Sequence, residues 1–145
     1  MTYTLKQVTI RTNNGPEGME KMGALWADVA SGKLSVLQEG IMPIAKYHNY
    51  ESNHKGDFDM SIIGVTGDFI DELENQTNNG IYKKYYVDDQ GSDMVACIRE
   101  AWQNVWSEED AGQLSRGYTQ DYEISTPAEF SKDGKASCCL YIAIK

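Results

Sequence analysis

The chain has 145 residues, enough for one domain with its own core, and 41% of them are hydrophobic, which is typical of a folded protein rather than a disordered one. The formal net charge of -9 argues against nucleic-acid binding, because phosphate contacts require clustered lysine and arginine. An acidic surface attracts cationic molecules weakly at cellular salt, and in most proteins it serves solubility.

The cysteines and the first residues indicate a reducing, cytoplasmic setting. The opening MTYTLKQVTI lacks the apolar run of a signal peptide, and no stretch approaches the roughly 20 apolar residues of a membrane span. Cys97, Cys138 and Cys139 are odd in number, and neighbours in one strand point to opposite faces, so Cys138 and Cys139 are poorly placed to bridge each other. No CxxC pair, HExxH helix or phosphate-binding glycine loop is present, so we expect neither metal nor cofactor.

The first half of the chain predicts a strand, a helix and a hairpin. Residues 2–11 alternate well enough for a strand, and apolar side chains at helical spacing predict a helix over about Pro16–Ser31. Residues 43–52 and 58–67 have the composition of two strands joined by the turn HKGD. The segment 68–80 is acidic and contains asparagine and glycine, so we expect a connecting segment with room for one helical turn.

The second half repeats that order. A strand over residues 81–89 precedes a helix over about Ser92–Glu108, with Ser92 as a helix cap and Trp102 in its apolar stripe. Two strands, 116–126 and 136–145, close the chain.

The repeated order predicts an α+β fold made of two β-α-β-β units. The expected helices begin 77 residues apart, at Pro16 and Asp93, and the hairpins 74 residues apart, at Pro43 and Gly117, which suggests a duplication. We expect one domain with halves of about 1–75 and 80–145, related by pseudo-twofold symmetry. An antiparallel sheet would carry two long helices on one side, with a central cleft between them.

Glu123 is the first candidate site residue. In the strand DYEIS it shares a face with Asp121 and Ser125, in an aromatic-rich part of the chain. A carboxylate drawn into apolar surroundings is costly unless a cation or hydrogen bonds satisfy it, so such a residue is a candidate binding group. The alternative is that Glu123 pairs with Arg99, Arg116 or a lysine on a partly solvated strand.

Other polar and aromatic residues have simpler interpretations. Trp102 and Trp106 lie one helical turn apart, and an aromatic stripe of this kind belongs to a core more often than to a ligand platform. His48 and His54 have no partner acid at catalytic spacing and are interpreted as surface residues, so no Ser/His/Asp set is proposed.

Four segments carry a resemblance to a known family: EAWQNVW, DYEI, LYIAIK and GIYKKYYVDDQGSD. Taken in chain order, they resemble the GyrI-like small-molecule-binding family, also described as the bacterial transcription-activator effector-binding domain, over nearly the whole chain. The resemblance implies a cleft that accepts lipophilic cations and other drug-like molecules. Members are often the sensing half of transcription regulators, and this chain resembles those that stand alone.

The resemblance also implies site residues. The pocket glutamate of the family matches Glu123, and the aromatic residue of its closing strand matches Tyr141. Tyr50 and Tyr85 lie in strands where the family places pocket aromatics. The closing-strand acid of many members is Cys139 here and the usual proline is Ala143, so the second pocket carboxylate is missing.

These observations lead to a binding hypothesis with Glu123 lying among Trp102, Tyr50 and Tyr141. The protein would bind lipophilic, cationic or flat aromatic molecules for sensing or sequestration, without direct contact to nucleic acid or membrane. Two alternatives are a hydrolase of strained, cyclopropane-type toxins that uses Glu123, and a gyrase-protecting protein that acts through a protein partner. The ligand-binding set comprises Glu123, Tyr141, Trp102, Tyr50, Tyr85, Trp106 and Cys139.

Overall fold

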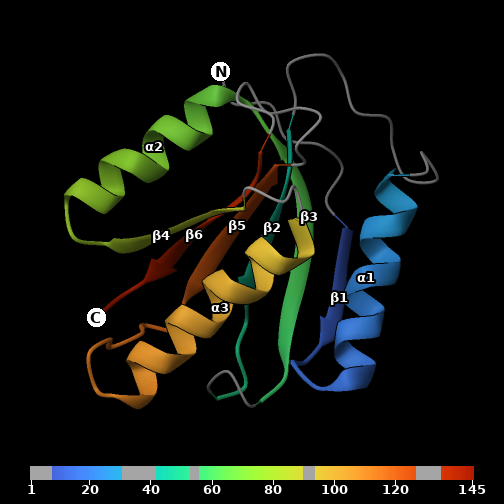
Figure 1. The fold of residues 1–145 in the computed structure, drawn as a ribbon, viewed down its shortest axis with the longest axis horizontal. Helices are drawn as coiled ribbons and strands as arrows, with labels where there is room; N and C mark the ends of the chain where they lie inside the picture. Colours follow the sequence, from blue (N-terminus) through green and yellow to red (C-terminus); the bar gives the residue numbers. More distant parts are fainter. Residues whose placement is uncertain (1–7, 31–41, 53–55, 90–93, 127–134) are drawn as a thin grey trace. The chain divides into compact units, whose positions relative to one another are not determined.

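The computed structural model describes residues 8–30, 42–52, 56–89, 94–126 and 135–145, which form three helices and six strands (Figure 1). The chain divides into two compact units. The first comprises the residues up to Glu72 together with Tyr118–Gln120, and the second comprises Leu73–Gly117 and Asp121–Lys145.

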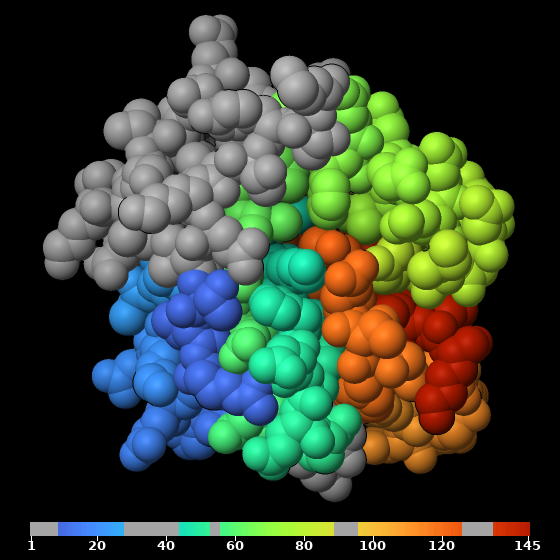
Figure 2. Space-filling view, turned by 180° about the vertical axis from the view of Figure 1, so that it is seen from behind, coloured from blue at the N-terminus to red at the C-terminus, as the bar shows by residue number. Residues whose placement is uncertain are grey.

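In the first unit one helix accompanies three antiparallel strands. The elements in chain order are β1 (Val8–Thr12), α1 (Pro16–Ala30), β2 (Met42–His48) and β3 (Phe58–Val65). β3 is the central strand and pairs with β1 on one side and β2 on the other. Seen from behind, β1, β3 and β2 lie side by side at the surface (Figure 2).

The second unit has the same plan, with elements β4 (Tyr82–Asp89), α3 (Met94–Asp110), β5 (Gln120–Thr126) and β6 (Ala136–Ala143). β6 is central and pairs antiparallel with β4 and β5. α3 lies across one face of these strands (Figure 1) and buries Cys97, Ala101 and Val105 against them. The strand side chains in that core include Cys138, Leu140 and Ile142, so the even-numbered residues of β6 face α3.

The two units repeat one another in order and in register. Three elements of the second unit begin 78 residues after their counterparts in the first, namely Met94 after Pro16, Gln120 after Met42 and Ala136 after Phe58. The pairing Ala45↔Ile62 recurs at the same offset as Glu123↔Leu140. The α+β class is therefore confirmed, and each unit carries the β-α-β-β order. A pseudo-twofold relation of the units in space stays a prediction.

The prediction that residues 68–80 hold at most one helical turn was wrong. They belong to α2 (Gly67–Asn78), so the described chain has three helices where two were expected. Phe69, Ile70 and Leu73 form a short apolar stripe, and Leu73 is buried. The helix ends at Asn78, and Gly80, with a φ of 80°, follows in a turn that has hydrogen bonds from Gly80 N–H to Thr77 O and from Ile81 N–H to Gln76 O.

Two predicted strands are shorter than expected because of left-handed residues. β2 ends at His48, since Asn49 has a φ of 53°, and β5 begins at Gln120, after Tyr118 with the same φ. α3 ends at Asp110, two residues beyond its predicted end. The predicted cap Ser92 and residues 2–7 of the first predicted strand lie outside the described residues.

Candidate functional site

The second unit buries several charged groups where α3 and the segment after it meet β5. We call Trp102, Glu109, Arg116, Asp121 and Glu123 the Glu123 cluster. Asp121 is fully buried, and Glu123 and Arg116 are each 3% exposed. Burial of this many ionisable groups is unusual in a small domain, because each loses hydration that must be replaced.

Glu123 points toward α3 and is held by neutral donors. It lies opposite Leu140 of β6, so it shares the face of the sheet that α3 covers. The indole Nε1–H of Trp102 donates a hydrogen bond of 2.7 Å to Glu123 Oε1, and the hydroxyl of Ser125 donates one of 3.2 Å to Oε2. Both oxygens therefore have a partner inside the unit.

Arg116 supplies the positive charge of the cluster. Its Nη2 donates to Asp121 Oδ2 at 2.7 Å, and its Nη1 lies 3.8 Å from Glu109 Oε1. Its guanidinium carbon also lies 5.9 Å from the ring centroid of Trp102. Asp121 in turn accepts the backbone N–H of Ala143 at 2.9 Å, which ties the cluster to β6.

The Glu123 cluster contains one guanidinium, which pairs with Asp121 and lies near Glu109, and a third carboxylate, that of Glu123. The nearby indoles of Trp102 and Trp106 are half-buried, with centroids 6.1 Å apart and planes tilted by 32°. Excess negative charge beside aromatic faces is the chemistry that attracts an organic cation. Trp102 contacts Glu123, as the binding hypothesis requires, and Glu123 is buried rather than partly solvated. The alternative that Glu123 pairs with a cationic side chain stays open.

Tyr141 and Cys139 do not join this cluster. Tyr141 lies opposite Tyr122, and Cys139 opposite Ile124, so both share the face turned away from α3, whereas Glu123 is on the α3 face. The expectation that Glu123 lies beside Tyr141 was therefore wrong, whereas Cys139 and Tyr141 share one face, as expected. Cys139 is half-buried, and burial raises the pKa of its thiol.

Two Lys–Glu–Tyr clusters occupy the opposite faces of β4 and β6. On the α3 face, Glu108 accepts from Lys83 Nζ at 2.5 Å and from Tyr85 Oη at 2.9 Å. The hydrogen bond from Lys83 lowers the pKa of Glu108, and burial raises the pKa of Tyr85 to about 12. Tyr85 thus links β4 to α3.

The other face carries the matching arrangement with α2. Glu74 accepts from Lys84 Nζ at 2.5 Å and from Tyr141 Oη at 2.6 Å. The hydrogen bond from Lys84 is the main cause that lowers the pKa of Glu74, and burial raises that of Tyr141. These contacts give Tyr85 and Tyr141 a role in attaching helices to the sheet.

Tyr50 belongs to the first unit and lies among aromatic rings. Its ring centroid is 5.7 Å from that of Phe58 and 5.3 Å from that of Tyr118. The ring is half-buried. The structure therefore brings together Glu123, Trp102 and Trp106 of the predicted set, and places Tyr85, Tyr141, Cys139 and Tyr50 in other surroundings.

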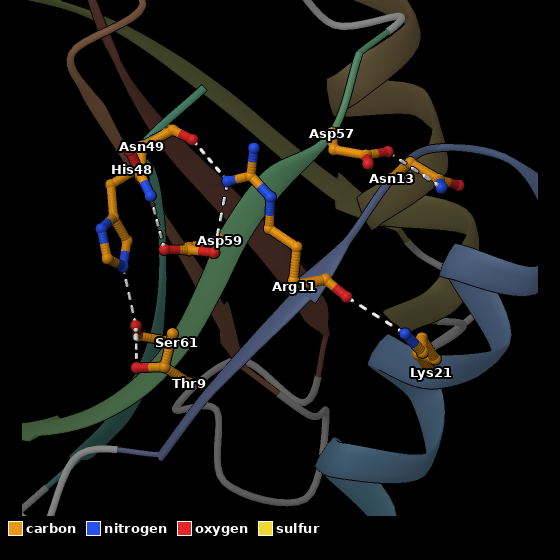
Figure 3. A network of polar contacts seen from close by, with 9 residues as sticks. All are labelled: Thr9, Arg11, Asn13, Lys21, His48, Asn49, Asp57, Asp59 and Ser61. Atoms are coloured by element: carbon orange, nitrogen blue, oxygen red, sulfur yellow. Dashed lines mark hydrogen bonds and ion pairs between the residues drawn. The ribbon is translucent and has the colours of Figure 1, made fainter. Parts of the chain in front are cut away.

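Sequence reasoning missed a polar network on the first unit (Figure 3). His48 Nε2 and the hydroxyl of Thr9 each lie 2.8 Å from Ser61 Oγ. His48, interpreted as a surface residue, is half-buried, and burial lowers its pKa. His54 lies outside the described residues.

The network continues along the same strands. Asp59 accepts from Arg11 at 3.3 Å and from Asn49 at 3.0 Å, and the hydrogen bond from Asn49 is the main cause that lowers its pKa. Asp59 lies opposite both Arg11 and His48. Alternation within β1, β2 and β3 could have suggested this grouping, but only once the register of the three strands was known.

A hollow of about 210 Å³ lies beside this network at the start of α1. Its lining mixes two cationic and two anionic side chains with neutral groups: Arg11, Thr12, Asn13, Glu17, Gly18, Lys21 and Asp57. Lys21 Nζ donates to the backbone oxygen of Arg11, and Asn13 donates to Asp57. The lining groups thus bind one another.

Comparison with known proteins identifies the fold only. No family model and no curated protein matches the chain. A solved structure of an integron cassette protein from the mobile metagenome of Vibrio cholerae is similar over 100% of this chain and 95% of its own, with 20% sequence identity and a TM-score of 0.66. In the part of the chain that the structure describes, no helix is long and apolar enough to cross a bilayer. The resemblance to the GyrI-like family stays a prediction.

Proposed function

We propose that this protein binds lipophilic organic cations and flat aromatic molecules beside the Glu123 cluster. Glu123 would be the charge partner of the ligand, and the rings of Trp102 and Trp106 would contact its apolar part. The outcome of binding would be sequestration, or sensing through a partner protein. The proposal is consistent with the resemblance to stand-alone effector-binding domains.

The excess of negative charge in the Glu123 cluster carries this proposal. Carboxylates that share a buried site repel one another, and an added cation relieves that repulsion. A ring face contributes about 0.5–2 kcal/mol to binding a cation, depending on desolvation. Neutral aromatic ligands would gain only from buried area, at roughly 25 cal/mol per Å².

The proposal includes the pseudo-twofold arrangement and central cleft expected from the sequence. In that arrangement the ligand would enter the cleft and meet Glu123 from there. Tyr141, Cys139 and Tyr85 are left out of the direct contacts, because the first two lie on the other face and Tyr85 binds Glu108. Tyr50 stays a predicted lining residue of the cleft.

Titration with a rhodamine-type cation, followed by quenching of tryptophan fluorescence, tests the proposal. We expect micromolar affinity for the wild type and at least about tenfold weaker binding for Glu123→Gln. Glu100→Gln is the matched control, since Glu100 is an exposed residue of the same helix as Trp102. A neutral dye of the same shape should bind both variants like the wild type.

Two results would contradict the proposal. Equal loss of the cationic and the neutral dye in Glu123→Gln would show that the carboxylate serves only packing. Absence of binding by the wild type would remove the site altogether. Turnover of a strained cyclopropane electrophile that Glu123→Gln abolishes would instead support the hydrolase alternative, with Glu123 as the general base.

A further inference from the structure

β4 is the terminal strand of the second unit. Within the described chain it pairs with β6 alone, and all eight of its residues follow one unbroken register, from Tyr82↔Ala143 to Asp89↔Ala136. A strand with only one neighbour has unpaired backbone N–H and C=O groups along its other edge. β4 contains no proline, and its register contains no bulge that would prevent further pairing.

The helices are attached to the faces of this strand rather than to its edge. Glu108 of α3 binds Lys83 and Tyr85 on one face, and Glu74 of α2 binds Lys84 on the other. Tyr86 is 58% exposed, which is high for an aromatic side chain in the middle of a strand. The outer edge of β4 therefore combines available backbone groups with an exposed aromatic residue.

The sequence of β4 is complementary to itself in one antiparallel register. If the strand YKKYYVDD pairs with a second copy about a twofold axis at Tyr86, the two Tyr86 residues lie opposite each other and Lys84 of each copy lies opposite Asp88 of the other. Residues directly opposite in an antiparallel pair share a face, and opposite charges there are favourable. Lys84 and Asp88 are both exposed.

Neighbouring registers lose this match. A twofold axis at Tyr85 would place Lys84 opposite Tyr86, and one at Val87 would place Tyr86 opposite Asp88. A twofold axis that passes between two residues would place a residue of one face opposite a residue of the other face. Residues that lie opposite each other in an antiparallel pair must share a face, so these registers are excluded. Charge complementarity thus selects the register centred on Tyr86.

We propose that two copies of this chain pair through β4 in that register and form a closed dimer. The contact is isologous, which means that each copy contributes the same outer edge of β4. No free β4 edge remains after pairing, so the assembly stops at two copies. This inference is independent of the proposed ligand site, because Tyr86, Lys84 and Asp88 are not members of the Glu123 cluster.

Sedimentation equilibrium of the wild type and two matched variants tests the dimer. In Asp88→Lys, Lys84 of each copy would lie opposite the new lysine of the other copy, so the dimer would contain two repulsive pairs. The dissociation constant should rise at least about tenfold. Asp110→Lys changes the net charge equally at an exposed site on α3 and should leave the constant unchanged. The double variant Lys84→Asp/Asp88→Lys exchanges the charges and should recover most of the affinity, although it also loses the ion pair between Lys84 and Glu74.

Crosslinking tests the register itself. Cys139 lies opposite Tyr86 within one chain, so Tyr86→Cys is made together with Cys139→Ser to prevent an internal disulfide. Mild oxidation should join two Tyr86→Cys chains, whereas Lys84→Cys in the same background should stay monomeric in the denatured state. Far-ultraviolet circular dichroism confirms that each variant is folded.

Three results would overturn the inference. If the wild type stays monomeric at several hundred micromolar protein, the proposed dimer does not form. If Asp88→Lys leaves a dimer intact, that dimer is formed by a surface other than the edge of β4. Assemblies that grow beyond two copies would mean that β4 pairs with a different edge, such as β1, the terminal strand of the first unit.

Discussion

The indole Nε1–H of Trp102 donates a 2.7 Å hydrogen bond to Oε1 of Glu123, a carboxylate that is 3% exposed. A buried carboxylate needs donors in place of water, and here α3 supplies one and β5 supplies another through Ser125. The aromatic residue predicted as a ligand platform is therefore also a structural partner of the predicted charge. Stability and binding should respond to the same two residues.

Replacement of Trp102 by Phe should destabilise the protein by about 1–3 kcal/mol, because it removes a donor from a buried carboxylate. Urea unfolding at neutral pH measures the change. Trp106→Phe is the matched control at the neighbouring half-buried indole, and it should cost less. Equal losses for the two variants would mean that the effect comes from packing area alone.

Glu123→Gln should leave the free protein as stable as the wild type, or up to about 1 kcal/mol more stable. The amide keeps an acceptor for Trp102 and removes one of the three carboxylate charges of the Glu123 cluster. Glu123→Ala should instead cost about 2–4 kcal/mol, since it leaves a cavity and an unpaired indole N–H. Thermal unfolding without ligand compares the variants, and a strongly unstable Glu123→Gln would contradict the repulsion argument.

Acid should weaken the attachment of α2 and α3 to β4. The pKa values of Glu74 and Glu108 are lowered from 4.5, mainly by hydrogen bonds from Lys84 and Lys83, so their ionised forms stabilise the fold. This contribution is complete above about pH 4.5 and is lost as the pH falls through the lowered values. It is small, below about 1 kcal/mol each, because solvent screens these half-exposed pairs.

The double variant Glu74→Gln/Glu108→Gln measures that contribution. The free energy of unfolding should depend less on pH below about 4.5 than it does in the wild type. Glu100→Gln, on the exposed side of α3, should leave the dependence unchanged. If the unfolding free energy of the double variant depends on pH as in the wild type, the two clusters do not favour the ionised forms of Glu74 and Glu108.

His48 should lower stability at mildly acidic pH. Burial and the nearby Lys46 lower its pKa from 6.5, while Asp59 acts in the opposite direction. The neutral ring is therefore preferred in the folded state, and stability falls as the pH drops below about 6.5 toward the lowered value. His48→Gln should flatten the profile of unfolding free energy between pH 7 and 5, and a wild-type slope in that variant would contradict the assignment.

Cys139 should react with a small thiol reagent at a rate that a bound cation does not change. It lies on the face of β6 turned away from Glu123, so a ligand at the Glu123 cluster does not cover it. For the same reason Cys139→Glu should not tighten cation binding. Rates of labelling with and without saturating dye measure the first effect, and clear protection by the dye would place ligand on the Tyr141 face.

Much of the fold could be predicted from local sequence patterns. The helix beginning at Pro16 and most strands followed from apolar periodicity, which is a property of neighbouring residues. α2 was missed because its acidic and amide residues outweighed a stripe of only Phe69, Ile70 and Leu73. The packing of Leu73 in the second unit, at 2% exposure, stabilises that helix beyond its intrinsic propensity.

The candidate site could be predicted only in part from the sequence. Alternation within β5 correctly grouped Glu123 with Asp121 and Ser125. It could not show which residues of β6 share that face, because a shift of one residue in register exchanges the faces. The observed pairing of Glu123 with Leu140 places Tyr141 on the other side of the sheet.

The sequence by itself determined the α+β class, the repeated β-α-β-β order and the aromatic setting of Glu123, because periodicity and composition act over a few neighbouring residues. Only the tertiary structure decided that Trp102 binds Glu123, that Arg116 pairs with Asp121, and that Tyr141 faces α2 instead. The first and the last of these contacts join residues 21 and 67 positions apart in the chain. Their geometry depends on strand register and helix packing, which no local pattern specifies.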